Sequence, residues 1–124
     1  MFIIVLKYLK SLSEVDRWMK QHVAFLQKFY QSGHFIVSGR QIPRRGGIIV
    51  ARASSRAELD QIIEEDPFFE HGVAEFLVIE FQASMSHPAF RSLTGLDETH
   101  RSESTLHTEC SAATQTRIRS ILKR

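Results

Sequence analysis

Apolar positions recur at two different spacings along the first 83 residues. Residues 2–9 form a nearly continuous run of β-branched, aromatic and aliphatic side chains, with the length of one strand buried on at least one face. From residue 14 to residue 32, apolar side chains instead recur every three or four positions, which predicts an amphipathic helix. Ser13 is its expected N-cap, and Gly33 is expected to end it in the left-handed conformation. The inward positions of this helix are Val15, Trp18, Met19, His22, Phe25, Leu26, Phe29 and Tyr30.

A β-hairpin is predicted after the helix. Residues 35–38 and 48–52 are short apolar runs that end or begin at glycines, which is typical of strands joined by a turn. The loop between them, residues 40–45, is polar and contains a proline and three arginines.

A second helix and a last strand complete this part of the chain. Ser54 or Ser55 is the expected N-cap of the helix, and the Asp66-Pro67 pair is expected to end it because a residue before proline disfavours helical backbone. Residues 73–81 alternate well enough to predict a strand. The inward positions of the second helix are Ala57, Leu59, Ile62 and Ile63.

The order strand, helix, strand, strand, helix, strand predicts an α+β fold of ferredoxin-like βαββαβ topology with a four-stranded antiparallel sheet. In this topology both helices cover the same face of the sheet. Several strand residues are apolar on both faces, so the uncovered face needs a partner, and a second copy of the chain meets that need. We therefore expect a homodimer that packs sheet to sheet.

The composition changes near residue 84. From there to the last residue, Ser and Thr outnumber apolar residues, so this segment has weak means of burying itself. We expect residues 1–83 to form the folded domain and residues 84–124 to form a polar, loosely ordered extension. Ile118, Ile121 and Leu122 recur at helical spacing among basic residues, which predicts a short helix over residues 115–124.

Charge and cysteine content narrow the classes of partner. The formal net charge is only +2, which gives no reason to expect nucleic acid or an anionic membrane. No apolar run approaches the length that would span a bilayer. One cysteine, Cys110, forms neither an internal disulfide nor a thiolate metal site. We expect a cytoplasmic protein whose partner, besides its own copy, is a small molecule.

His22 is the first candidate for chemistry. It lies within the apolar stripe of the first helix, so its imidazole is expected to point toward the sheet, where a polar ring must find a hydrogen-bond partner. Two interpretations stay open. His22 is either a core histidine that only holds the fold or a general acid or base that lines a pocket.

Asp66 is the natural partner for His22. It follows two glutamates and precedes Pro67, Phe68 and Phe69, which places a carboxylate at the edge of an apolar patch after the second helix. A structural role is equally plain, because an aspartate before proline is a common N-cap, here for a short turn over residues 67–70. If the two side chains meet, the carboxylate would orient the imidazole and raise its basicity.

The remaining histidines and the arginines of the hairpin loop are weaker candidates. His34 and His71 are expected in loops, and His71 either lines the same patch or is solvated. We assign no metal site, because His87, His100 and His107 lack metal-ligand spacing. The three arginines are either solvated or bind a carboxylate or phosphate group of a substrate; they are Arg40, Arg44 and Arg45.

Several separated motifs over residues 1–82 resemble the YciI-like (YCII-related) family. They are the opening strand, the segments Glu14-Val15-Asp16 and His22-Val23-Ala24-Phe25-Leu26, the stretch from Gly33 to Gly39, the loop ending Pro43-Arg44-Arg45-Gly46-Gly47, Glu65-Asp66-Pro67-Phe68, and Gly72-Val73-Ala74-Glu75. The chain departs from many relatives at Gly39-Arg40, where a proline is common. No counterpart is found for the residues beyond about 90.

The resemblance implies a protomer that dimerises into an α/β barrel, with a histidine and an aspartate in the active site that correspond to His22 and Asp66. It implies cofactor-free chemistry on a small cyclic substrate, such as dehydrochlorination of a hydroxyquinone or lactone isomerisation. The expected substrate-binding residues are Trp18, Ser38, Arg40 and Phe68. A binding or regulatory module with the same pocket is the alternative, and fold analogy alone adds a cofactor-free monooxygenase.

Overall fold

The computed structural model describes residues 1–96 and 114–117. The first 80 residues form β1 (Phe2–Tyr8), α1 (Leu12–Gln31), β2 (Phe35–Arg40), β3 (Gly46–Ala51), α2 (Arg56–Ile63), α3 (Pro67–Glu70) and β4 (Ala74–Glu80). A 3₁₀ turn, η1 (Pro88–Phe90), then leads into α4 (Arg91–Thr94), and a last strand is β5 (Thr114–Arg117).

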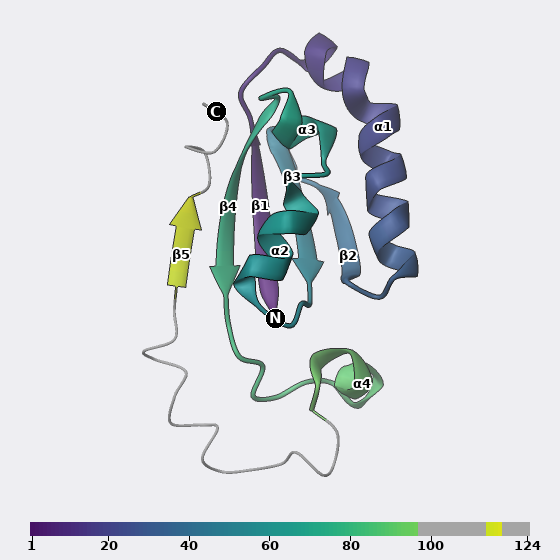
Figure 1. The fold of residues 1–124 in the computed structure, drawn as a ribbon, viewed down its shortest axis with the longest axis vertical. Helices are drawn as coiled ribbons and strands as arrows, with labels where there is room; N and C mark the ends of the chain where they lie inside the picture. Colours follow the sequence, from purple (N-terminus) through teal and green to yellow (C-terminus); the bar gives the residue numbers. More distant parts are fainter. Residues whose placement is uncertain (97–113, 118–124) are drawn as a thin grey trace.

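The strands form one antiparallel sheet in the order β2-β3-β1-β4-β5. Helices α1, α2 and α3 all lie against the same face of it (Figure 1). Strands β1 to β4 and the intervening helices reproduce the predicted βαββαβ order, so the ferredoxin-like fold is confirmed.

The core lies between the sheet and the helices. Alternate residues of β1, namely Phe2, Ile4 and Leu6, are at most 2% exposed, as expected for a strand with one face covered. They pack with the inward residues of the helices and of the neighbouring strands; among these are Val15, Phe25, Phe29, Phe35, Ile49, Leu59, Ile62, Ile63, Phe76 and Val78.

Local signals set the ends of α1. The helix begins two residues earlier than the sequence predicts, because Ser11 and not Ser13 is the N-cap: the Ser11 hydroxyl accepts a hydrogen bond from the Glu14 N–H. Gly33, with a φ of +87°, ends the helix as predicted.

The second helix is capped by Ser55 and ends at Ile63, earlier than the predicted stop. Its inward stripe is Leu59, Ile62 and Ile63, whereas Ala57 is exposed and the prediction for it was wrong. Asp66 instead begins the next element. Its side chain accepts a hydrogen bond from the Phe68 N–H and caps α3, which has Pro67 in its first turn.

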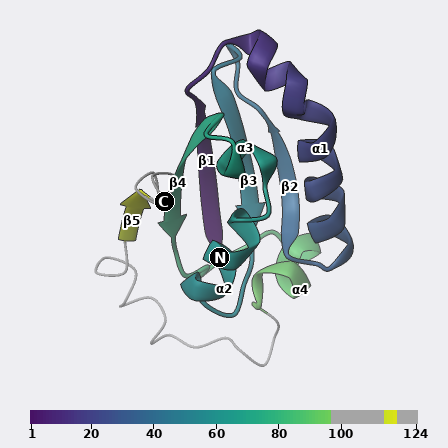
Figure 2. The same cartoon turned by 45° about the horizontal axis from the view of Figure 1, so that its top comes forward.

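Part of the extension folds back on the domain. The guanidinium of Arg52 donates hydrogen bonds to the carbonyls of Ser92 and Leu93 and so ties α4 to the end of β3. The helix predicted over residues 115–124 is wrong where the structure describes it, because residues 114–117 pair as β5 with β4, beside which they lie in both views (Figure 2). The open edge of β4 provides hydrogen-bond partners for the backbone of these four residues, whereas a short isolated helix is only marginally stable. Residues 118–124 lie outside the described residues.

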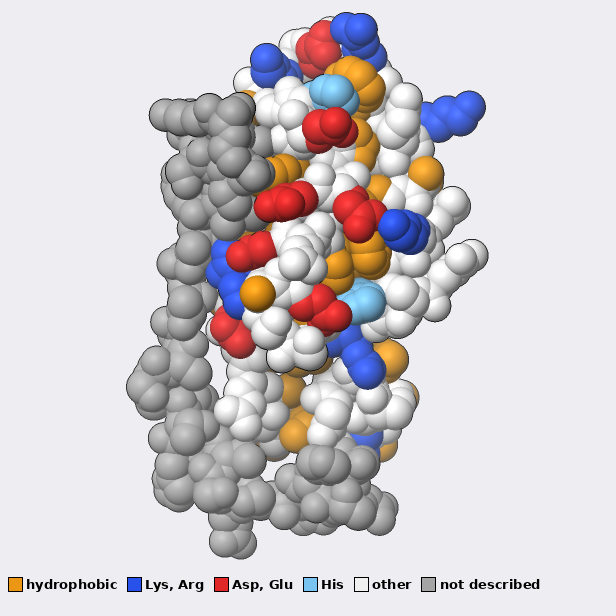
Figure 3. All heavy atoms as spheres, viewed as in Figure 1, with side chains coloured by type: hydrophobic (Ala, Val, Ile, Leu, Met, Phe, Trp, Pro, Cys, Tyr) orange, Lys and Arg blue, Asp and Glu red, His pale blue; other side chains and the backbone are white. Residues whose placement is uncertain are grey.

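Part of the helical face carries paired charges. Side chains of Asp and Glu gather over α2 and α3 with basic side chains beside them (Figure 3). Asp60 is paired with Arg56, and Glu65 is paired with Lys28. Among the described residues, no helix is both long and apolar enough to cross a membrane.

Candidate active site

His22 and Asp66 meet beneath helix α1. The Nδ1 atom of His22 lies 2.9 Å from Oδ1 of Asp66, in a buried contact between residues 44 positions apart in the sequence. Helix α1 aims the imidazole at the sheet, and the cap of α3 fixes the carboxylate. When Nδ1 donates its proton to the carboxylate, the lone pair of His22 Nε2 faces away from Asp66.

Asp66 is fully buried, and its two oxygens differ. Oδ1 accepts hydrogen bonds from both His22 Nδ1 and the Phe68 N–H, whereas no donor among the described residues reaches Oδ2. Burial raises the pKa of the Asp66 carboxyl above its ordinary value, and the hydrogen bonds from His22 and Phe68 oppose that rise.

Aromatic packing holds the imidazole in place. The ring of Phe68 is stacked on that of His22, with 4.0 Å between centroids and 4° between planes. Phe25, one turn further along α1, lies against the same imidazole at 6.1 Å. Only 8% of His22 remains exposed, so the imidazole has little freedom to rotate away from Asp66.

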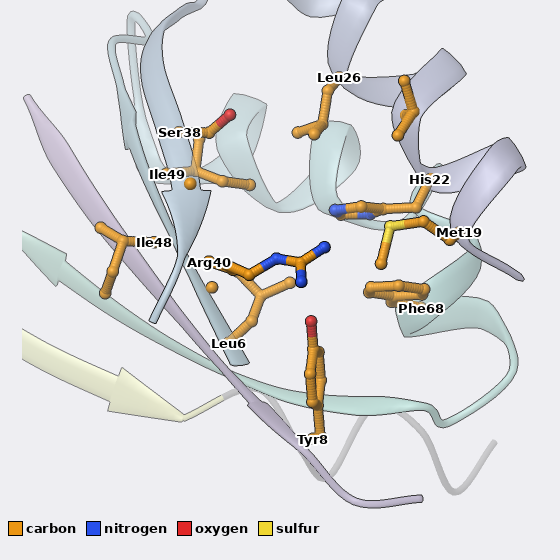
Figure 4. A pocket seen from close by; sticks show the side chains of 13 residues that line it. Leu6, Tyr8, Met19, His22, Leu26, Ser38, Arg40, Ile48, Ile49 and Phe68 are labelled. Carbon is orange, nitrogen blue, oxygen red and sulfur yellow. The ribbon is translucent and has the colours of Figure 1, made fainter. Parts of the chain in front are cut away.

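The imidazole borders a cavity of about 140 Å³ between α1 and the sheet (Figure 4). Its polar lining groups are the side chains of Tyr8, His22, Ser38 and Arg40. The rest of the wall is mostly apolar and includes Leu6, Met19, Val23, Leu26, Ile49 and Phe68. A small, mostly apolar cavity with a few convergent polar groups is the usual form of a ligand site.

Three of the four predicted substrate-binding residues line this cavity. Ser38, Arg40 and Phe68 are at the cavity, and the Ser38 hydroxyl is hydrogen-bonded to that of Tyr30. Trp18 is not. It stacks on His71 with centroids 3.8 Å apart, and both rings line a neighbouring groove on the other side of α1. Positions 18 and 22 are one turn apart and both stack on aromatic rings at α3 or its C-cap, but only His22 borders the cavity.

Tyr8 is a cavity residue that the sequence analysis missed. Its ring meets Phe68 edge-on at 6.1 Å, and its hydroxyl points into the cavity toward Arg40 (Figure 4). A signal was present, because Tyr8 continues the alternation of Phe2, Ile4 and Leu6 and must therefore share the helix-covered face.

The three arginines of the hairpin differ in their surroundings. The Nη2 atom of Arg44 lies 2.6 Å from Oδ1 of Asp16, and this hydrogen bond raises the pKa of the Arg44 guanidinium. Arg40 and Arg45 are both exposed, but Arg40 lines the cavity, whereas Arg45 lines neither the cavity nor the neighbouring groove. Within the described ranges, no three His, Cys, Asp or Glu side chains lie close enough together to hold a metal ion.

Comparison with known proteins places this geometry in a family. The family model described as the YCII-related domain matches residues 1–82. No curated protein matches the chain. A solved structure with a similar fold is 5-chloro-2-hydroxyhydroquinone dehydrochlorinase (TftG) from Burkholderia phenoliruptrix, in complex with 2,5-dihydroxybenzoquinone. The TM-score is 0.55 at 19% identity, over 72% of this chain and 97% of that one. At this identity the likeness concerns the fold, and the match over residues 1–82 shows that the chain belongs to the YCII-related domain family.

Proposed function

We propose that the protein is a small cofactor-independent enzyme that moves a proton on a small cyclic or aromatic substrate. His22 acts as the general base or acid, and Asp66 orients it. The observation that carries this proposal is the 2.9 Å contact between the two side chains at the wall of a cavity. A carboxylate behind an imidazole fixes its tautomer and stabilises the imidazolium that forms when the ring accepts a proton.

The chemistry follows from the direction of the free lone pair. Nε2 of His22 takes a proton from a carbon or hydroxyl of the ring, and the electron pair of the broken bond moves into the ring toward a carbonyl oxygen. In an isomerisation, imidazolium returns that proton to a different carbon. In an elimination, the electron pair instead expels a leaving group as an anion, and the proton stays on His22 until solvent removes it.

The comparisons support this class of reaction. TftG, as its name states, is a dehydrochlorinase of a hydroxylated aromatic ring, and it was solved with a quinone bound. The cavity of the present chain has a size and lining that suit a compound of that kind. A ligand-binding module without turnover is the alternative, because the same cavity would bind a ring without any proton transfer.

Proton exchange separates the two functions. The purified protein is first screened by thermal shift against 2,5-dihydroxybenzoquinone, a butenolide and cyclohexanone, because a compound that binds the native state raises the melting temperature. Deuterium incorporation from D2O into each compound that binds is then followed by NMR. We expect His22→Gln to slow incorporation by about 10²- to 10⁴-fold, the usual contribution of a general base.

His34→Gln is the matched control for that experiment. His34 lies outside the cavity, where it contacts Ser32 and Glu58, and its replacement should leave exchange unchanged. Equal exchange rates for the wild type and His22→Gln, with every compound that binds, would reject the catalytic role and leave the binding module.

We also propose that the protein forms a homodimer through the face of the sheet that the helices leave uncovered. Cross-strand partners share a face, and the register places two rows of apolar side chains there. All of them are at least partly exposed; they are Ile3, Val5, Val37, Ile48, Val50, Leu77 and Ile79. An apolar surface that spans four strands favours burial against a second copy.

A further inference from the structure

The cavity has an uneven charge distribution. Among its lining residues there is no Asp or Glu, whereas Arg40 brings a permanent positive charge. The carboxylate behind the imidazole, Asp66, is fully buried and already accepts two hydrogen bonds. The groups that a bound molecule meets are therefore a guanidinium, an imidazole and two hydroxyls.

Arg40 is placed to use that charge. It is the last residue of β2 and lies opposite Gly47 of β3, where no neighbouring side chain blocks it. Its guanidinium extends into the cavity toward Tyr8 and Met19 (Figure 4). No hydrogen bond or ion pair holds the Arg40 side chain within the part of the chain that the structure describes, in contrast to Arg44, which is paired with Asp16.

Tyr8 adds a neutral donor on the same side. Its hydroxyl points toward the Arg40 guanidinium, and its ring meets Phe68 edge-on. The Arg44 guanidinium, which also interacts with Tyr8, lies 6.0 Å from the centre of the same ring. The stick view shows His22 on one wall and the pair Arg40 and Tyr8 across from it (Figure 4). A guanidinium beside a phenol is a site for an oxygen that carries negative charge.

We propose that Arg40 and Tyr8 form an oxyanion-binding pair, and that the substrate is a single six-membered ring that carries a carboxylate or an ionised enol or phenol oxygen. This inference rests on the proposed function, because it names the substrate class of the same cavity. The volume of about 140 Å³ is close to that of an engineered cavity of about 150 Å³ that binds benzene, so the cavity has room for one six-membered ring.

The same arrangement would stabilise the negative charge that develops on the ring when His22 removes a proton. When the imidazole takes a proton, negative charge moves through the ring to an oxygen on the far side. Fixed donors at that oxygen stabilise the developing charge without reorganising during the reaction. Arg40 then sets substrate specificity, since a ring without an oxyanion leaves the guanidinium unmatched.

The test measures binding of three one-ring compounds by isothermal titration calorimetry. Benzoate supplies a carboxylate, 4-nitrophenolate above its own pKa supplies a phenolate, and benzamide is the neutral comparison. The variants are Arg40→Gln, Tyr8→Phe and, as the matched control, Arg45→Gln, which removes an exposed charge of the same loop outside the cavity. Circular dichroism and melting curves without any compound establish that each variant folds.

We expect the wild type and Arg45→Gln to bind at least one of the two anions more tightly than benzamide. Arg40→Gln should weaken that anion about tenfold, as loss of a charge-assisted contact predicts, and should leave benzamide unchanged. Tyr8→Phe should have a smaller effect in the same direction. Preference for benzoate or for 4-nitrophenolate distinguishes the two kinds of oxyanion.

Equal affinity of folded Arg40→Gln and wild type for both anions would overturn the proposal, as would tighter binding of benzamide or no binding of either anion to the wild type. The failures remain distinguishable. Exchange that depends on His22 but not on Arg40 leaves the proposed function intact and rejects the oxyanion pair. Anion binding that depends on Arg40, without exchange that depends on His22, supports the oxyanion pair and rejects the catalytic role of His22.

Discussion

Asp66 uses a single oxygen for two tasks. Its Oδ1 atom caps α3 through the Phe68 N–H and at the same time holds His22 Nδ1, while Oδ2 is buried without a donor among the described residues. A buried carboxylate in that position is costlier in the folded chain than in water, which is why its pKa is raised.

The sign of that shift predicts how stability depends on pH. Because the folded state binds the Asp66 proton more tightly than the unfolded state does, the stabilisation from protonation is full below the ordinary value of 3.8 and is lost as pH rises through the raised pKa. Asp66→Asn keeps an acceptor for Phe68 and removes this titration. We expect its free energy of unfolding at pH 7 to equal or exceed that of the wild type.

Guanidinium chloride unfolding from pH 3 to pH 7 checks this expectation. The stability of the wild type relative to Asp66→Asn should fall as pH rises across that range. Asp66→Ala is the control, since it also removes the acceptor and should be less stable than Asp66→Asn by about 1–3 kcal/mol, the cost of leaving buried donors unsatisfied. An Asp66→Asn variant that is clearly less stable than the wild type at pH 7 would contradict the account.

Sequence reasoning found the paired residues but not all of their surroundings. The helical stripe pointed His22 inward, and Asp66-Pro67 marked a cap. The topology allowed the two side chains to meet but did not require it, and the structure brings them together. Tyr8 was missed because an apolar run predicts a strand but does not show which residues of that strand border a cavity. Trp18 lines the neighbouring groove and not the cavity beside His22, because helical spacing alone does not say on which side of the short α3 a side chain passes.

At the scale of elements, the contact between β1 and β3 depends on the absence of a side chain at Gly46. A Cβ atom on Gly46 would lie 1.7 Å from the carbonyl oxygen of Leu6, a backbone atom of β1 that has no room to yield. Strand β3 therefore approaches β1 closely where the hairpin begins. This approach sets the position of the residues that follow, among them Gly47 opposite Arg40.

Gly46→Ala should consequently destabilise the protein by about 1–3 kcal/mol, the usual cost of overpacking. Urea unfolding followed by circular dichroism measures the change. Gly39→Ala in the same hairpin is the matched control, because a Cβ at Gly39 meets nothing within 4 Å and the backbone there has no positive φ. Equal losses in the two variants would contradict the role of the close approach, since alanine in place of glycine in a strand otherwise favours the folded state.

The elements with strong periodicity were predictable, and those that depend on a neighbour were not. Alternation and the 3.6-residue stripe gave β1, α1 and β4 to within a few residues. The start of α1 was displaced because both Ser11 and Ser13 are suitable caps, and their hydroxyls in fact bond to one another. The strand at residues 114–117 depends on the open edge of β4, which local spacing does not report.

For the whole molecule, the uncovered sheet face predicts the oligomeric state. Val5 lies at the centre of one of its rows, between Ile48 on β3 and Leu77 on β4. An aspartate there would have to be buried without a partner if two copies packed together. Val5→Asp should therefore convert a dimer into a monomer, as measured by size-exclusion chromatography with light scattering.

Leu12→Asp is the control for that experiment, since Leu12 is an exposed apolar residue at the start of α1, on the helical side of the sheet. It should remain dimeric. A wild-type protein that is monomeric at all concentrations, or a Val5→Asp variant that stays dimeric, would reject the proposed interface while leaving the cavity and its chemistry unaffected.

Alternate residues of strand β1 face the cavity and the uncovered face of the sheet. Leu6 and Tyr8 face the cavity, whereas Ile3 and Val5 face outward from the same seven residues. Inserting or deleting one residue in this strand would exchange the two sets, because side chains alternate with a period of two. A substitution at one position of β1 therefore affects one surface, whereas a change in the length of the strand affects both at once.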